Sequence, residues 1–249
     1  VGEIKGKEGL STVSEALFLI QGLNAHDIFP DWIALNNGTT HGIEKSDQGI
    51  QVQLTKEIHD ALKPYKISGA QHGTSGNNSD RLRAIVKETA TTKANVATAL
   101  QMISWGLKVN EYGNAFQDEQ GNFVKLSDSG VTDKLWNEMV EYANSKSIKG
   151  GDYKKLNLPF ENKLFGQPRD VRDRMAKGVE DFVYDILVNV FNAGDTAPLA
   201  VEAILKANSY DLGPKGKRIE NKDDWTPEKI AERAKKLAGD KGPGGNFDD

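Results

Sequence analysis

Two histidines of this chain, His41 and His72, each follow an expected β-strand, and each is followed by glycine. They lie one strand–helix unit apart, so in a parallel sheet both should sit at adjacent strand ends on the same face. Imidazole is a common zinc ligand, and two imidazoles so placed can share a Zn²⁺ ion. Two unrelated loop histidines are the alternative. The spacing therefore predicts a metal site without establishing one.

The loop of residues 72–76, with the sequence His-Gly-Thr-Ser-Gly, has the composition of an anion-binding loop. Its glycines permit close backbone approach and unusual φ angles, Ser75 can donate its hydroxyl group, and the next helix points its positive end at the loop. An ordinary surface turn is the alternative. Residues 95–98, Asn-Val-Ala-Thr, predict a second anion loop at the next strand end.

The remaining candidate ligands are few. His26 lies in a helix-to-strand loop, and we expect it to be structural. His59 stands in a helical stretch between Glu57 and Asp60, and we expect it to be a solvated surface residue. A catalytic zinc site needs at least three protein ligands. Glu3, at the end of the first expected strand, could be the third ligand or could orient one, or the third ligand could come from sequence outside these residues.

Four strand–helix alternations position these residues. Strands are expected near residues 1–4, 32–35, 67–70 and 93–98, and helices at 14–23, 54–62, 82–88 and 99–107, the first capped by Ser11. This alternation predicts an α/β fold, either a doubly wound sheet or a (β/α)₈ barrel. Because a whole barrel needs about 250 residues, four units in this space would be half of one.

The pattern changes after residue 107. We expect a mostly helical extension over residues 108–211, with helices at 133–143, 171–190 and 196–207 and a loop at 146–167. Residues 212–249 are rich in Lys, Asp, Gly and Pro and predict a polar, partly disordered tail, with a helix starting at Thr226.

Composition limits the function classes. The chain has 249 residues, a mean hydropathy of -0.56 and no stretch near the roughly 20 apolar residues of a membrane span. It contains no cysteine, which excludes thiolate zinc sites and disulfides. A formal net charge of -4 argues against nucleic-acid binding. No targeting segment is visible, which favours the cytoplasm. The chain begins at Val1, without Met and inside the first expected strand, as a fragment of a longer protein would.

The order of these motifs resembles the class II, zinc-dependent fructose-bisphosphate and ketose-bisphosphate aldolases. The second half of that family's barrel carries a strand-end Glu, a small-residue loop ending in His-Gly, then His-Gly-x-Ser-Gly, then Asn-Val-x-Thr. Here these are Glu3, Thr40-His41-Gly42, residues 72–76 and residues 95–98. The resemblance covers about residues 1–105 and returns weakly around residues 168–193.

The resemblance implies the last four βα units of a TIM barrel over residues 1–107. It also implies reversible cleavage of a ketose 1,6-bisphosphate to dihydroxyacetone phosphate and glyceraldehyde 3-phosphate, a step of glycolysis and gluconeogenesis. Fructose is favoured over tagatose as the sugar, and the choice between them stays open. Zn²⁺ would polarise the carbonyl and stabilise the enediolate, and a monovalent cation is left open as a second cofactor. The implied metal ligands are His41, His72 and Glu3, the implied catalytic residues are Asn95 and Glu8, and the implied phosphate-binding residues are Gly42, Gly73, Ser75, Asn95, Val96, Ala97 and Thr98.

Two departures from the family leave alternatives open: residues of its first half-barrel are missing, and the stretch after the last barrel unit is longer than we expect for the family. The further zinc His and the acid/base Asp of the family's first half-barrel have no counterpart here, so a missing N-terminal half or a second chain would have to supply them. A non-catalytic phosphosugar-binding or regulatory subunit with a degenerate barrel is therefore the alternative, and a zinc lyase or isomerase with another phosphorylated substrate is a third. We expect a phosphorylated ketose as substrate, no nucleic-acid or membrane partner, and a homodimer or higher homo-oligomer.

Overall fold

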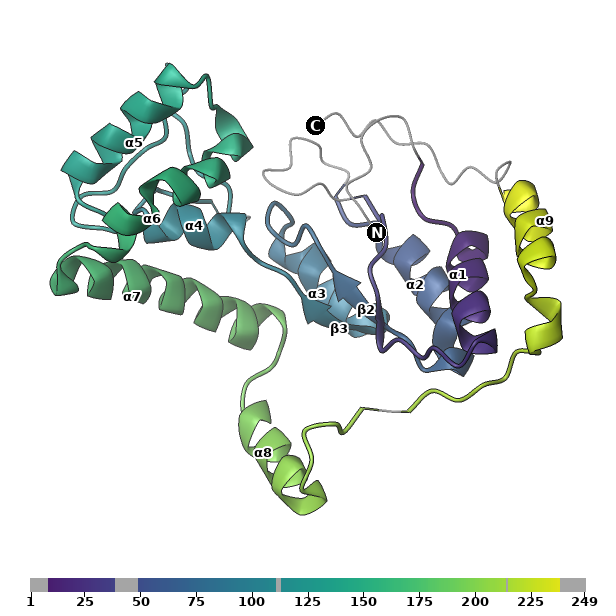
Figure 1. Cartoon of the computed structure of the whole chain (residues 1–249). Coiled ribbons are helices and arrows are strands. Elements are labelled where there is room, and N and C mark those ends of the chain that lie inside the picture. Colours follow the sequence, from purple (N-terminus) through teal and green to yellow (C-terminus); the bar gives the residue numbers. More distant parts are fainter. Residues whose placement is uncertain (1–8, 39–48, 111–112, 214, 238–249) are drawn as a thin grey trace.

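A computed structural model of the chain describes residues 9–38, 49–110, 113–213 and 215–237. Within these ranges helices surround a small parallel sheet (Figure 1). The elements are α1 (Val13–Ala25), β1 (Trp32–Ile33), α2 (Val52–Leu62), η1 (Lys63–Tyr65), β2 (Ser68–Gln71), α3 (Ser79–Glu88), β3 (Thr91–Ala94), α4 (Thr98–Ser104), α5 (Asp133–Ser145), η2 (Gly150–Leu156), α6 (Asn157–Phe165), α7 (Arg169–Asp185), η3 (Ile186–Val190), α8 (Thr196–Ala207), η4 (Lys222–Asp224) and α9 (Pro227–Leu237).

The sheet has the order β1-β2-β3, and both strand pairs are parallel. Ile33 pairs with Gly69, and Gln71 pairs with Ala94, so consecutive strands lie side by side. Each connection contains a helix, as parallel strands require. The predicted α/β alternation is confirmed for these three units. The first expected strand, residues 1–4, lies outside the described residues.

The helices α1 and α2 cover the sheet with a small aliphatic core. Thr12 begins α1 with a reciprocal cap: its Oγ1 accepts from Glu15 N at 3.1 Å, and its own N–H donates to the Glu15 carboxylate at 2.9 Å. The expectation that Ser11 caps this helix is wrong, because the Ser11 hydroxyl accepts from Asn36 N instead. The core beneath α1 and α2 consists of Ala16, Ile20, Ile33, Ile58, Leu62, Tyr65 and Ile67.

A second core, rich in aromatic residues, lies under α4, α5, η2 and α6. Trp105, Trp136 and Tyr153 stack in sequence, with ring centroids 6.3 and 6.2 Å apart. The turn-rich stretch after α4 forms antiparallel bridges around the turn at Asp118 and contributes Phe123 to this core. The predicted loop at residues 146–167 is wrong, because η2 and α6 occupy most of it, and they bury Leu156 and Phe160 in this core.

Two later segments return to the rest of the molecule in different ways. The helix α7 packs along α4, while α8 projects away from the body and contains no buried residue (Figure 1). The predicted long helix at 171–190 is confirmed as α7 and its π-helical continuation η3. None of the helices in the described ranges is long and apolar enough to cross a membrane.

The segment of residues 217–237 packs back onto α1. Trp225 is 1% exposed and lies against Gly22, and its ring centroid is 5.6 Å from that of Phe18. The Asn24 side chain donates to Lys217 O at 2.9 Å and accepts from Ile219 N at 2.9 Å. The composition of this segment indicated a tail and gave no sign of this packing.

Candidate functional site

The carboxyl ends of the three strands meet at one edge of the sheet. His72-Gly73 and Asn95-Val96 come directly after β2 and β3, and Asn36-Asn37 follow β1 after two intervening residues. Asn95 N donates to Gln71 O at 2.9 Å, which continues the strand pairing one residue past β3. Ligands of open α/β sheets bind at this edge, outside the carboxyl ends of the strands.

His72 and Asn95 lie in direct contact at this edge. Asn95 Nδ2 is 3.1 Å from His72 Nδ1 and 3.3 Å from His72 Nε2. Lys93 Nζ donates to Asn95 Oδ1 at 2.7 Å, which leaves the amide nitrogen turned toward the imidazole. The structure thus brings together two residues that the sequence places on separate loops.

The loop of residues 72–76 has the backbone that its glycines predict. Gly73 and Gly76 have φ angles of +62° and +92°, a region that glycine enters at no steric cost. Asn77 holds the loop from inside: its Nδ2 donates to Gly73 O at 2.9 Å, and its Oδ1 accepts from Ile50 N at 3.0 Å. Asn78 then caps α3 by accepting from Arg81 N at 2.7 Å. Hydrogen bonds within and behind the loop therefore fix its conformation.

The loop at residues 95–98 lies next to the 72–76 loop. Ser75 Oγ accepts weakly from Ala99 N at 3.5 Å, which ties the 72–76 loop to the start of α4, one residue past the second predicted anion loop. Ala97 precedes α4 without any side-chain cap, and Thr98 is buried at the first position of that helix. Thr74 Oγ1 is buried and has no hydrogen-bond partner among the described residues.

The other predicted site residues, Glu3, Glu8, His41 and Gly42, lie outside the described residues. Within the described ranges, no three His, Asp or Glu side chains cluster as a metal site requires. His72 by itself suits Zn²⁺, because a neutral imidazole at an open strand edge is a normal zinc ligand. A complete ligand set would need side chains from outside those ranges.

His59 is not the solvated surface residue that its neighbours Glu57 and Asp60 suggested. It is 2% exposed, and its Nδ1 accepts from Ala90 N at 3.2 Å. Its ring lies over Gly69, where an added Cβ would come within 2.3 Å of Cε1. Burial lowers the pKa of His59, and the nearby Asp60 only partly opposes this. The helical period of α2 places residue 59 on its inner face, but the charged residues Glu57 and Asp60 suggested a position facing solvent.

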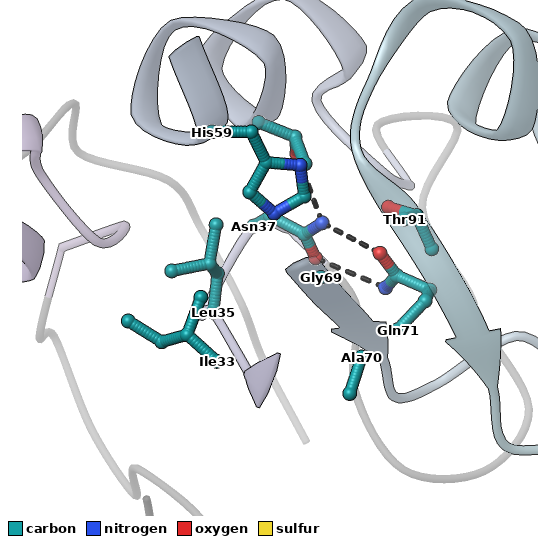
Figure 2. Close-up of a pocket in the computed structure, with 9 residues that line it drawn as sticks. Ile33, Leu35, Asn37, His59, Gly69, Ala70, Gln71 and Thr91 are labelled. Atoms are coloured by element: carbon teal, nitrogen blue, oxygen red, sulfur yellow. Dashed lines mark hydrogen bonds between the residues drawn. The ribbon is translucent and has the colours of Figure 1, made fainter. Parts of the chain in front are cut away.

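A buried amide network beneath the strand edge was missed by sequence reasoning. Asn37 and Gln71 face each other in a small pocket that His59 also lines (Figure 2), and Thr55 belongs to the same lining. Asn37 Nδ2 donates to Gln71 Oε1 at 2.8 Å, and Gln71 Nε2 donates back to Asn37 Oδ1 at 3.1 Å. The sequence did contain a signal for this network. Asn37 and Gln71 stand near the ends of expected buried strands, and buried amides need hydrogen-bond partners.

These features are matched by a known family. The family model "Fructose-bisphosphate aldolase class-II" matches residues 1–147, more than half of the chain, and the chain therefore belongs to the class II fructose-bisphosphate aldolase family. The match runs past the sheet and includes the hairpin at Asp118 and helix α5. No curated protein matches the chain significantly.

Proposed function

We propose that the protein takes part in the reversible cleavage of a ketose 1,6-bisphosphate, fructose rather than tagatose, to dihydroxyacetone phosphate and glyceraldehyde 3-phosphate. The contact between His72 and Asn95 at adjacent parallel strand ends carries the proposal, because it places a metal-type ligand beside an amide donor. Family membership supports the same reaction class. The three strands would be part of a TIM barrel, and the cytoplasm would be its location.

The proposal assigns His72, His41 and Glu3 to a Zn²⁺ ion, which when bound would polarise the substrate carbonyl. The loops at residues 72–76 and 95–98 would hold the phosphate of the dihydroxyacetone half, with Gly42 beside them. The preformed loop would need no reordering when it binds, because its backbone already adopts the glycine conformations.

Cleavage of the carbon–carbon bond leaves the electron pair on the dihydroxyacetone phosphate half of the substrate. Asn95 Nδ2 already points at the imidazole of His72, and it would donate to the oxygen that gains negative charge. For the aldehyde to form, the hydroxyl group on its carbon gives its proton to a base, which would be the acid/base Asp supplied from outside these residues. Glu8 would take part in returning a proton to the carbon of the dihydroxyacetone phosphate half that carries the electron pair.

Aldol cleavage measured on the full-length protein, with and without EDTA and with Zn²⁺ added back, tests the proposal. Activity that depends on Zn²⁺ and is lost in His72→Ala is expected. Activity that survives both EDTA and His72→Ala would contradict it.

A non-catalytic phosphosugar-binding subunit is the second candidate. It is favoured by the lack, in these residues, of counterparts to the family's further zinc His and acid/base Asp. Calorimetry with dihydroxyacetone phosphate separates the two functions. Binding without turnover, in a preparation that contains no other chain, supports the second candidate, whereas turnover excludes it.

The proposed assembly is a homodimer. Helix α8 supports it, because apolar residues cover most of its circumference and Leu199, Val201 and Leu205 are exposed. A helix that is apolar nearly all round is normally buried. An antiparallel pair of these helices would also bring Glu202 of each toward Lys206 of the other, as an isologous contact requires. Light scattering of the wild type and of Leu199→Glu/Leu205→Glu tests this; a dimer in both would contradict the role of α8.

A further inference from the structure

The carboxyl ends of β1 and β2 are joined by a closed pair of side-chain amides. Asn37 and Gln71 are 1% and 4% exposed, and each donates one N–H to the carbonyl oxygen of the other. Their second N–H groups are also used. Asn37 Nδ2 donates to Thr55 Oγ1 at 3.0 Å, and Gln71 Nε2 donates to His72 O at 2.6 Å.

The network continues to the start of helix α2. Thr55 Oγ1 donates to Gln51 O at 2.8 Å, and Gln51 N donates to Asn37 O at 2.7 Å. Asn37 is thus bonded through its side chain and its main chain to the first turn of α2. Because both partners are anchored, the pair cannot shift along the strand edge without breaking several bonds.

Gln71 is held from both sides. Its side chain binds Asn37 beyond β1, and its main-chain oxygen accepts from Asn95 N beyond β3. The residue that follows it is His72, whose carbonyl oxygen the same side chain binds. The peptide unit of His72 is therefore oriented by a side chain that never reaches the exposed edge.

The pocket around these two positions is partly apolar. Ile33, Leu35 and Ala70 line it (Figure 2), together with the polar residues Thr55, His59 and Thr91. Leucine and methionine have nearly the shapes of asparagine and glutamine, and replacing both members of a buried polar pair with apolar groups is often neutral for stability. A packing role alone could therefore be filled by apolar side chains, whereas directional bonding to His72 O could not.

We infer that Asn37 and Gln71 are positioning residues, which orient the His72 backbone so that its imidazole meets Asn95 and the bound metal in one geometry. The inference rests on the proposed function for its metal. Asn37 and Gln71 would not bind the metal or the substrate themselves. They would orient His72, as residues outside the ligand shell often do for a metal ligand.

The test compares the wild type with Asn37→Leu/Gln71→Met. The double variant should unfold at nearly the wild-type temperature but bind Zn²⁺ about 10- to 100-fold more weakly, the usual effect of losing such partners. Competition with a chromophoric chelator measures the affinity, and kcat should fall more than KM rises. Asn37→Gln/Gln71→Asn, which restores a pair of the same total length, should recover part of the affinity. Gln21→Met is the matched control, because Gln21 bonds Tyr65 away from the strand edge.

A readout without zinc separates this inference from the proposed function. With four histidines in the chain, the ¹H–¹³C imidazole signals can be assigned individually. At one fixed pH the signal of His72 should move in the double variant, while that of His26 stays. If the wild type neither binds Zn²⁺ nor cleaves the substrate but the His72 signal moves, the proposed function fails and the positioning role stands.

Wild-type zinc affinity together with an unmoved His72 signal in the double variant would overturn the inference. If the double variant does not fold, Thr55→Val serves instead, because it removes one anchor of Asn37 with little change of shape. Thr55→Val should then show a smaller loss of zinc affinity and a smaller shift of the His72 signal. An unchanged affinity and an unchanged His72 signal in Thr55→Val would equally overturn the inference.

Discussion

The strand edge and the aromatic core under α4–α6 are stabilised by opposite means. Around His72 the buried side chains are mainly amides and hydroxyls beside glycines, and hydrogen bonds hold them. Around Trp136 the buried side chains are aromatic and aliphatic, and they are held by packing. Hydrogen bonds have direction and set the orientation of groups, whereas apolar burial mainly supplies stability. We therefore expect changes at the edge to affect chemistry and changes in the aromatic core to affect folding.

His72→Ala should have the largest effect on chemistry. Loss of a metal ligand should reduce zinc affinity and turnover by more than the about 100-fold that loss of an outer partner causes. The melting temperature of the metal-free protein should hardly change, because the side chain is partly exposed. His26→Ala is the control, since His26 bonds Trp225 O on the far side of α1. Equal losses of activity in His72→Ala and His26→Ala would show that the strand edge has no special part in the chemistry.

Met139→Ala should show the reverse behaviour. Met139 is fully buried between α5 and the rest of the aromatic core, and its truncation should cost about 2–5 kcal/mol of the free energy of unfolding. Urea unfolding measures this loss. Under conditions in which the variant is folded, its zinc affinity should match that of the wild type. A large change in affinity would mean that the two regions are coupled rather than separate.

Gly69→Ala probes the layer beneath the strand edge. The new methyl group would meet the His59 ring, and overpacking of this kind costs typically about 1–3 kcal/mol. Adding His59→Ser should relieve part of the loss, because it removes the ring that the methyl group meets. Additive losses in the double variant, measured by urea unfolding, would show that the strain lies elsewhere.

The pH dependence of stability should carry a smaller contribution from His59. Burial lowers its pKa in the folded protein below the ordinary value of 6.5, so the unfolded chain binds the proton more readily. The contribution of neutral His59 to the free energy of unfolding is therefore fully present above pH 6.5 and is lost as the pH falls below it. In His59→Gln, the urea midpoint measured between about pH 5 and 7 should fall less steeply on acidification than in the wild type. Parallel curves would exclude this contribution.

The sequence predicted the sheet units well because the strand–helix alternation is a periodic signal. It also placed His72 and Asn95 on neighbouring strand ends, where the structure brings them into contact. The failures came where a tertiary contact overrides a local pattern. The charged neighbours of His59 concealed its burial over a glycine, and the polar residues around Phe160 concealed a helix that packs into the aromatic core.

The Asn37–Gln71 pair marks a different limit of sequence reasoning. Each amide by itself resembles a loop residue, and only the parallel register brings them together across two strands. The roles of Glu3, Glu8, His41 and Gly42 stay predictions, since these residues lie outside the described ranges.

The packing of Trp225 on α1 has a consequence for biosynthesis. His26 and Trp225, which share a hydrogen bond, are separated by 199 positions in the chain. Contacts this distant close a long loop and form late. During translation the Phe18 and Gly22 face of α1 is exposed from the moment it leaves the ribosome until Trp225 follows. Helix α1, which leaves the ribosome before the other described helices, is thus among the last of them to complete its packing. A nascent chain stalled before Trp225 would present that apolar face to chaperones.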